Sequence, residues 1–326
     1  MLRSELLRKK LLKKWNLLVP MGIGISPTMR CNLSCTGCYS RLHPREDEMS
    51  PEVIDSLIEE SSNAGVFLYI VTGGEPFIRS DLMEIYQKYP HLMFLIITNG
   101  TLLDEELVRK IADSGNIIPV LSIEGNEEET DERRGKGVYS KVLKAMKLLK
   151  SYRVPFGFSA VATRKNIAHL GDGNFMETLL KEGCRFGFFT DFIPIASDDF
   201  QLLPEEEQLK NFRNRLRSIK EEGEIFPVHL PDDEYDKTGR CRAVGEGGMH
   251  INAQGFVEPC PFAHFARENI KDCSFLEVLR SPFLNAIRNH PDALRHGKIG
   301  CSLVNNHDLL EEIASTTGAM PTRAMV

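Results

Sequence analysis

The sequence predicts an α/β fold, a partial (βα)6 barrel of the TIM type followed by a small C-terminal extension. Between residues 22 and 193, short apolar and β-branched runs alternate with helical patterns, which is typical of βαβ units and a parallel sheet. Polar or glycine-rich residues follow each of these runs, as expected for loops at the carboxyl edge of such a sheet. After residue 197 the alternation stops, so a different structure must follow.

The N-terminal segment, residues 2–18, predicts a basic amphipathic helix. It combines six Arg and Lys side chains with leucines and a tryptophan at helical spacing, and Pro20 ends it. Such a helix either packs against the main domain or lies on an anionic membrane surface as a peripheral contact.

The six strands of the barrel are predicted at 23–28, 66–71, 93–98, 117–123, 156–162 and 185–193. Helices between them are indicated by N-cap residues, of which Ser50 followed by Pro51 is the clearest. The resulting division of the chain is a helix at 1–20, a barrel at 21–197, a bridging segment at 198–238 and a C-terminal domain at 239–326. Within the last part, 250–252 and 256–258 predict a hairpin around the turn 253–255.

Composition and charge exclude several classes of protein. The chain has 326 residues, 42% of them hydrophobic, and a net charge of -6, which suits a soluble globular protein and not a general nucleic-acid binder. We find no apolar run long enough for a membrane span and no secretory cleavage site. Eight cysteines, three of them clustered, favour metal ligation in a reducing cytoplasm over a disulfide scaffold.

The densest group of potential metal ligands is the loop CNLSCTGC, which contributes Cys31, Cys35 and Cys38. A structural zinc site usually has four ligands and would take its second pair from another motif, which is not nearby. A cubane iron-sulfur cluster held by three cysteines leaves one iron open to a small molecule. We therefore expect the chemistry at that iron.

A second motif, Gly73-Gly74-Glu75-Pro76, follows one βα unit later. Without a Cβ, the two glycines allow a ligand to approach the backbone carbonyls closely, and Glu75 adds a charge-assisted acceptor for an ammonium group. The alternative is an ordinary βα turn.

The two motifs, with Tyr39 after the third cysteine, resemble the radical S-adenosylmethionine (radical SAM) superfamily. The resemblance implies a [4Fe-4S] cluster on the three cysteines and S-adenosylmethionine on the open iron. Gly37 stands where many members carry an aromatic residue, so Tyr39 is expected to cover the adenine. By the same resemblance the glycine-rich turn holds the amino group, and ribose and carboxylate contacts fall to Asn99, Ser122, Ser159 and Arg164.

The C-terminal cysteines form a second candidate site. The spacing Cys241, Gly255, Cys260 resembles the SPASM and twitch extensions of the superfamily, which implies one auxiliary iron-sulfur cluster. The predicted ligands are Cys241, Cys260 and Cys301, with Cys273 as fourth ligand, and His264 or an open iron are alternatives for that position. Zinc on the same four cysteines remains an alternative, and Cys184 is expected to be a core residue.

The resemblance implies reductive cleavage of S-adenosylmethionine and hydrogen abstraction from a peptide, protein or small molecule. An auxiliary cluster can accept an electron from the substrate radical or bind the substrate. A flavodoxin or ferredoxin is expected as reductant, and Glu124, Asp191 and Arg240 are candidate substrate contacts. Two alternatives stay open, a radical methyl or adenosyl transferase and a non-enzymatic iron-sulfur or zinc protein that carries electrons or scaffolds a partner.

The segment after Glu124 is less informative. Arg133, Arg134 and the Gly135-Lys136-Gly137 run form either a lid near the site or a surface turn, since the run lacks the frame of a phosphate-binding loop.

Overall fold

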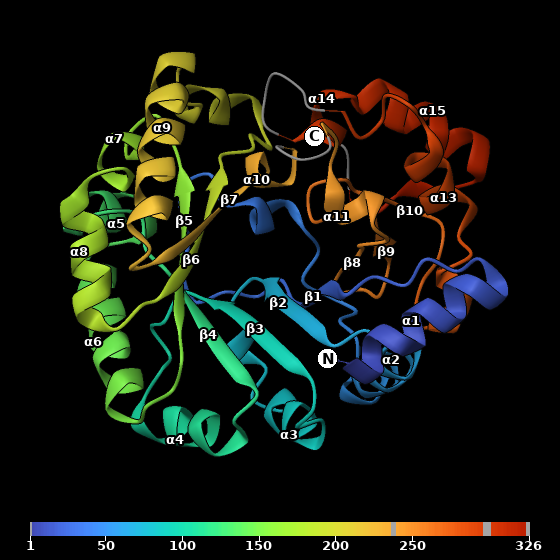
Figure 1. Cartoon of the computed structure of the whole chain (residues 1–326), viewed down its shortest axis with the longest axis horizontal. Helices are drawn as coiled ribbons and strands as arrows, with labels where there is room; N and C mark the ends of the chain where they lie inside the picture. The colour runs from blue at the N-terminus through green and yellow to red at the C-terminus, as the bar shows by residue number, and fades with distance from the viewer. Residues whose placement is uncertain (1, 236–238, 296–300, 324–326) are drawn as a thin grey trace. The chain divides into compact units, whose positions relative to one another are not determined.

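The computed structural model describes residues 2–235, 239–295 and 301–323 (Figure 1). Its strands in the βα part of the chain are β1 (Gly22–Thr28), β2 (Leu68–Gly73), β3 (Met93–Thr98), β4 (Ile117–Ser122), β5 (Gly157–Ala162), β6 (Phe186–Asp191) and β7 (Phe226–Leu230). With β8 (His250–Ile251) and β9 (Val257–Glu258) they form a sheet of order β7-β6-β5-β4-β3-β2-β1-β8-β9. The sheet is mostly parallel, which confirms the predicted α/β class.

Helices connect the strands. They are α1 (Leu2–Trp15), α2 (Pro51–Ala64), α3 (Leu82–Lys88), α4 (Glu105–Ser114), α5 (Glu127–Arg134), α6 (Val138–Ser151), α7 (Ile167–Leu170), α8 (Gly173–Glu182) and α9 (Glu206–Glu222), with 3-10 turns η1 (Tyr39–Leu42), η2 (Pro76–Ile78) and η3 (Ser197–Leu202). Beyond β7 follow α10 (Asp232–Tyr235), α11 (Arg242–Gly245), α12 (Phe275–Val278), α13 (Pro282–Asn289), α14 (Ser302–Asn305) and α15 (His307–Thr317). Among the described residues, none of the helices combines the length and apolar character that a bilayer crossing needs.

The chain divides into two compact units. One consists of Met1–Arg30, Leu42–Leu95 and Glu234–Val326, and the other of Cys31–Arg41 and Ile96–Asp233. β3 runs across the boundary between them. The predicted four-part division separates the barrel from the extension, whereas the first unit combines β1 and β2 with the extension.

In the second unit, helices cover one face of β4 to β7 (Figure 1). Phe158 of β5 packs edge-to-face against Phe175 of α8, with ring centroids 5.9 Å apart. Phe189 of β6 makes the same kind of contact with Phe212 of α9 at 5.2 Å. Side chains alternate along a strand, so the residues next to Phe158 in β5 and next to Phe189 in β6 point to the opposite face of the sheet.

In the first unit, the core between strand and helix is also aromatic. Tyr69 of β2 stacks on Phe94 at 5.2 Å, and its hydroxyl forms a 2.7 Å hydrogen bond with Ser61 of α2. Helix α1 contacts α2. Its Arg8 also lies over the ring of Phe67, a residue that follows α2. Helix α1 therefore packs against other parts of the first unit, and none of its residues is fully buried.

The strand β7 corrects the predicted count of six. Residues 198–238 were expected to bridge two domains, yet Phe226–Leu230 pairs in parallel with β6. The segment contains Pro227, which argues against a central strand, but β7 lies at the edge of the sheet, where a missing N–H is tolerated.

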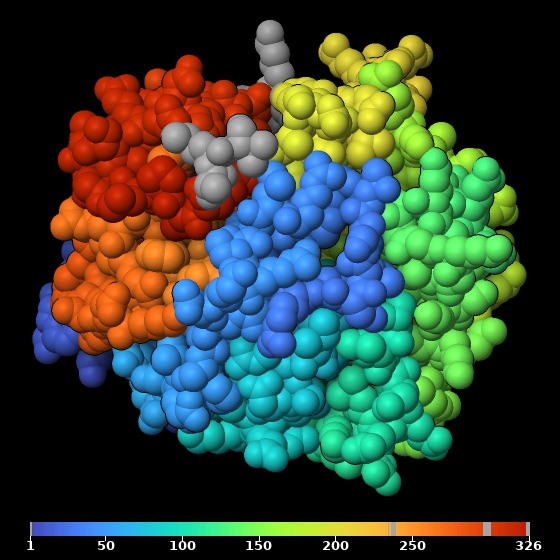
Figure 2. Space-filling view, turned by 180° about the vertical axis from the view of Figure 1, so that it is seen from behind, coloured from blue at the N-terminus to red at the C-terminus, as the bar shows by residue number. Residues whose placement is uncertain are grey.

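The C-terminal extension continues the sheet at its other end. The predicted hairpin is present, with His250 opposite Glu258 and Ile251 opposite Val257. Its first strand, β8, pairs in parallel with β1, and the helices α11 to α15 follow as the orange-to-red mass of Figure 2. A short antiparallel pair, β10 (Phe265–Ala266) and β11 (Met320–Pro321), completes it.

Candidate functional site

The cysteine loop follows directly after β1. Cys31, Cys35 and Cys38 are partly exposed, and their thiols form no disulfide bonds. A bulge between Ile25 and Thr28 shifts the register of β1 just before the loop. Such bulges redirect a strand end, so the thiols are presented beyond the sheet edge and not within it.

Neighbouring side chains fix the loop within its unit. The amide Nδ2 of Asn99 lies 3.9 Å from Cys31 Sγ and donates to Asn32 at 2.8 Å. The hydroxyl of Ser40 lies 3.1 Å from Cys38 Sγ. Asn99 is thus beside the cysteine loop, whereas Tyr39 begins the following η1 turn and is partly exposed.

A buried ion network supports the loop from α5. Glu124 is fully buried and pairs with both Arg133 and Arg134. The backbone N–H of Thr36 donates to the carbonyl of Arg133 at 2.9 Å. Burial by itself would raise the pKa of Glu124, but the two guanidinium groups outweigh it and lower the pKa below its ordinary value. The end of α5 is therefore an anchor of the cysteine loop and not a free lid.

The guanidinium groups of Arg133 and Arg134 also affect the pKa of Cys35 in the cysteine loop. Burial raises the pKa of the Cys35 thiol, while the nearby charges of Arg134 and Arg133 oppose that rise. Two cations beside a thiol favour its deprotonated form, which is the form that ligates metal. Arg133 also lines a small cavity next to the loop, together with Thr36, Glu129, Glu132, Thr163, Lys165, Asn166 and Leu202.

The surroundings of residue 37 explain why it is a glycine. Its φ is +65°, and a Cβ placed there would lie 2.8 Å from the ring of Phe192 and 3.0 Å from Leu202. Phe192 follows β6 and is 2% exposed. The space that a side chain at Gly37 would need is thus occupied by an aromatic ring from another strand.

The glycine-rich turn belongs to the first unit and packs on the end of β1. A Cβ on Gly73 would lie 2.4 Å from the carbonyl oxygen of Thr28, and one on Gly74 would lie 2.1 Å from that of Arg30. The N–H of Glu75 donates to the same Arg30 carbonyl at 2.9 Å. The close packing of this turn on residues 28–30 therefore requires glycine at both positions, whether or not a ligand also approaches them.

Glu75 itself is fully buried and caps η2, its Oε1 accepting from Phe77 N at 3.1 Å, and Pro76 takes the first position of that turn. The turn fixes the backbone next to Arg30, the residue immediately before Cys31.

The remaining predicted contacts differ in position. Ser122 and Ser159 are register partners in β4 and β5, so they share one face of the sheet. Arg164 is 49% exposed at its side chain and donates to the Leu203 carbonyl at 3.0 Å, with Glu205 at 3.6 Å. Arg164 is thus directed to the segment before α9, whereas Arg134 lies near Cys35 and Cys38.

In the extension, Cys260 is in contact with Cys301 and lies near Cys241. The contact with Cys301 and burial raise the pKa of the Cys260 thiol, and Cys241 adds to the effect. The N–H of Cys241 is held by the Leu294 carbonyl at 2.7 Å. These are the three residues predicted as principal ligands of an auxiliary centre.

Two other predicted positions lie elsewhere. The thiol of Cys273 donates to the carbonyl of Asn269 at 3.3 Å and is surrounded by acidic side chains, chiefly Glu268 and Glu277. His264 faces Glu258, with 3.7 Å between Nδ1 and Oε1. The structure thus does not group Cys273 with the other three cysteines. Cys184 is fully buried, in agreement with its expected place in the core.

The candidate substrate contacts are already occupied. The carboxylate of Glu124 is used by the two arginines, that of Asp191 lies 2.7 Å from His229 Nε2, and Arg240 donates to the carbonyl of Arg288 at 2.8 Å. Glu124 and Asp191 were predicted because they lie at the ends of predicted strands, but that position does not reveal which way a side chain points.

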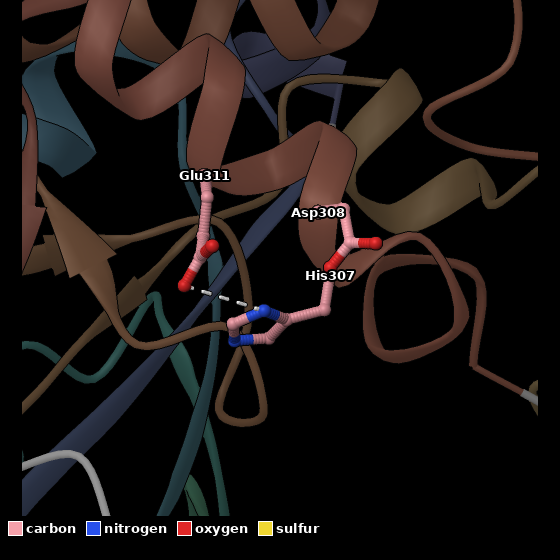
Figure 3. Close-up of side chains that lie close together, drawn as sticks. All are labelled: His307, Asp308 and Glu311. Carbon is pink, nitrogen blue, oxygen red and sulfur yellow. Dashed lines mark ion pairs between the residues drawn. The ribbon is translucent and has the colours of Figure 1, made fainter.

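Another cluster carries no site. Among the described residues, only His307, Asp308 and Glu311 bring three potential ligand atoms within 4.8 Å of one another (Figure 3). All three are exposed on α15, and the His307 to Glu311 distance of 3.6 Å is an ordinary i,i+4 pair.

Comparison with known proteins decides the family. Residues 25–172 match the model of the radical SAM superfamily. Residues 25–172 form a radical SAM domain. The matched segment contains the cysteine loop and the glycine-rich turn, so the predicted family is confirmed, and with it an enzyme that uses S-adenosylmethionine and an iron-sulfur cluster.

Two curated relatives resemble most of this radical SAM enzyme. A PqqA peptide cyclase of Gluconobacter oxydans is 26% identical over 82% of this chain and 79% of its own length. An AdoMet-dependent heme synthase of Methanosarcina barkeri is 25% identical over 84% of this chain and 85% of its own.

Solved structures confirm the fold. Streptococcus suis SuiB bound to S-adenosylmethionine has a TM-score of 0.72 at 17% identity, covering 93% of this chain and 76% of SuiB. SuiB bound to its precursor peptide SuiA has a TM-score of 0.68 at 18% identity, covering 93% and 74%.

Proposed function

We propose that this radical SAM enzyme modifies a peptide and uses an auxiliary iron-sulfur centre. The grouping of Cys241, Cys260 and Cys301 carries the proposal, because a second thiol site has no role in cleaving S-adenosylmethionine. Relatives named for peptide substrates, PqqA and SuiA, support the substrate class. The heme synthases define the competing class, a tetrapyrrole.

The residues at the first site suit its cofactors. Cys31, Cys35 and Cys38 would hold the [4Fe-4S] cluster, which when loaded supplies the electron that cleaves S-adenosylmethionine to a hydrogen-abstracting 5'-deoxyadenosyl radical. The turn beginning at Gly73 would receive the amino group at its backbone. Beside the cluster, Arg134 stays ionised because Glu124 is its partner.

The other contacts remain proposals. Tyr39 would lie at the adenine, and Asn99, Ser122 and Ser159 would contact the ribose or the carboxylate. Arg164 is the carboxylate partner expected from the sequence, and Arg134 is a second candidate because it is near two of the cysteines. Changing each arginine to Lys separately, and measuring S-adenosylmethionine affinity, discriminates between them: the true partner loses bidentate pairing and weakens binding about tenfold.

The auxiliary centre would take Cys241, Cys260 and Cys301 as ligands. With three thiols, one iron of a cubane is free for substrate or for His264 or Cys273 after rearrangement. Its role would be to accept the electron from the substrate radical, which makes the net reaction an oxidation. Zinc is the alternative occupant, since it also binds thiolates.

Iron analysis tests the proposal. Two cubanes correspond to about eight irons per anoxically reconstituted chain, and one cubane to about four. A Cys31, Cys35 and Cys38 triple alanine variant should lose S-adenosylmethionine binding and about half of the iron. Wild-type protein with about four irons and one zinc would contradict the auxiliary cluster and leave the first site intact.

The proposed partners follow from this chemistry. A flavodoxin or ferredoxin would supply the electron, and a reducing compartment such as the cytoplasm would keep the eight cysteines in the thiol form. Peripheral membrane contact through α1 remains an alternative, since its lysines and Leu2, Leu6 and Trp15 are exposed.

A further inference from the structure

Helix α1 packs on the protein with one of its sides. Its partly buried residues recur at intervals of three and four positions, and they are Ser4, Leu7, Arg8 and Leu11. This side contacts α2 (Figure 1). A Cβ on Gly65, which caps α2, would lie 2.7 Å from the carbonyl oxygen of Ser4 and 2.8 Å from Cγ of Arg8. The two roles expected for this segment, packing on the main domain and lying on a membrane, therefore use different sides of the helix and are compatible.

The exposed side of α1 combines cations with large apolar side chains. At about 100° per residue, seven exposed residues fall within an arc of about 140° around the helix axis. We call them the outer face, and they are Leu2, Arg3, Leu6, Lys9, Lys10, Lys13 and Lys14. Leu2 is 74% exposed and Leu6 is 59% exposed. A continuous surface of this kind suits a partner that offers both anionic groups and an apolar interior.

The charge of the outer face is largely uncompensated. Lys9 pairs with Glu5 at 2.6 Å. The other four cations of the outer face form no ion pair within the described part of the chain. Helix α1 carries six cations and one acid in a chain whose net charge is -6. Positive charge is thus concentrated on this helix, which predicts local attraction to an anionic surface and not attraction of the whole chain to polyanions.

We propose that the outer face binds the surface of an anionic phospholipid bilayer. The inference goes beyond the proposed function and does not rest on it. The leucines would enter the boundary between headgroups and acyl chains, and the lysines would lie at the lipid phosphates. Trp15, 48% exposed at the end of α1, suits this boundary because its ring has an apolar body and a polar N–H. A nucleic acid would contact the cations through its phosphates and leave Leu2 and Leu6 in water, so a bilayer accounts for more of the face.

Vesicle binding tests the proposal on the whole chain after anoxic reconstitution. In a sedimentation assay, vesicles of equal parts phosphatidylcholine and phosphatidylglycerol should bind the enzyme at least tenfold more tightly than vesicles of phosphatidylcholine alone. Raising the salt from about 0.1 M to about 0.5 M should weaken that binding at least fivefold, because salt screens surface charges. Equal affinity for the two kinds of vesicle overturns the proposal. Displacement from the vesicles by oligodeoxythymidylate at an equal phosphate concentration would assign the face to nucleic acid and also overturn it.

The only tryptophan of the chain, Trp15, lies in α1 and reports on this contact directly. Its fluorescence emission should shift to shorter wavelength when anionic vesicles are added, because the indole ring leaves water for the headgroup region. Vesicles of phosphatidylcholine alone should leave the emission unchanged. Sedimentation with anionic vesicles without a shift of the emission would mean that another part of the chain binds, which contradicts the proposal.

Charge variants localise the binding. Lys10→Glu/Lys13→Glu should weaken binding to the anionic vesicles at least tenfold, because two attractive charges become repulsive. Lys144→Glu/Lys147→Glu is the matched control, since it makes the same change in net charge at exposed positions of α6 in the other unit, and it should change binding less than twofold. An equal loss in the two double variants would reduce the effect to net charge and refute the site.

A leucine variant tests the apolar part of the contact. Leu2→Ser/Leu6→Ser should weaken binding to the same vesicles at least fivefold, because the apolar area that would leave water is lost. Unchanged binding would show that no side chain enters the bilayer and would overturn the proposal. All these substitutions lie at exposed positions, so the variants should keep the S-adenosylmethionine affinity of the wild type, which shows that they fold.

Discussion

Replacing Glu124 with Gln should destabilise the enzyme more than any surface substitution near the site. The carboxylate is fully buried and is bound by Arg133, by Arg134, whose Nε donates at 2.8 Å, and by Val161 N at 3.0 Å. Removing one partner of a buried ion pair costs about 3 to 5 kcal/mol because the opposite charge stays buried and unpaired. Two guanidinium groups lose their counter-ion here, so the upper part of that range is expected.

The loss should appear as a lower melting temperature. For a folded unit of 150 to 250 residues, 1 kcal/mol corresponds to about 2 to 4 °C, so a loss of about 4 to 5 kcal/mol should make Glu124→Gln melt about 8 to 20 °C below wild type. Glu132→Gln is the control: that carboxylate is 54% exposed and pairs with Lys165 at the surface, which predicts a shift below about 2 °C. Differential scanning calorimetry under anoxic conditions measures both. Equal shifts in the two variants would refute the network as an anchor.

The same carboxylate predicts a dependence on pH. Its folded pKa lies below the ordinary 4.5, so the unfolded chain binds the proton first. The contribution to stability is therefore complete above about pH 4.5 and is lost as the pH falls through the lower folded value. The melting temperatures of wild type and Glu124→Gln should converge below that value, and parallel curves across pH 3 to 7 would contradict the assignment.

Three further outcomes are expected. Cys301→Ala should retain about four of eight irons, whereas Cys184→Ala, which alters a buried thiol away from both sites, should retain all of them; equal iron contents would argue against the second site. Gly74→Ala should weaken S-adenosylmethionine binding at least tenfold in equilibrium dialysis, because its Cβ would meet a carbonyl at 2.1 Å, while Gly173→Ala, with its nearest contact at 3.4 Å, should bind normally. Phe192→Ala should cost about 3 to 5 kcal/mol in chemical denaturation, and a cost under 1 kcal/mol would mean that its ring does not support the cysteine loop.

Local pattern was sufficient for much of the fold. Strand β3 was predicted at 93–98 and is found there, and β2 is shifted by two residues to Leu68–Gly73. These strands are apolar runs between clear turn residues, so their existence is encoded locally. The hairpin of 250–258 was likewise signalled by its turn, although its parallel pairing with β1 was not predicted.

The missed features depend on partners distant in sequence. Nothing local reveals that Phe192 fills the space at Gly37, since the two are separated by a large part of the barrel. The pairing of Glu124 with two arginines could have been suspected from their spacing, because nine and ten residues separate them across one turn and one helix. Strand β7 was missed because Pro227 lowers strand propensity wherever it occurs, and only edge position makes it acceptable.

The hydrogen bond from the backbone N–H of Glu75 to the Arg30 carbonyl ties the glycine-rich turn to the peptide group that precedes Cys31. If the turn holds the amino group of S-adenosylmethionine and Cys31 holds the cluster, as proposed, a shift of either segment would be transmitted to the other through this bond. Substitutions in the distant strands should then leave the connection between the two motifs unchanged.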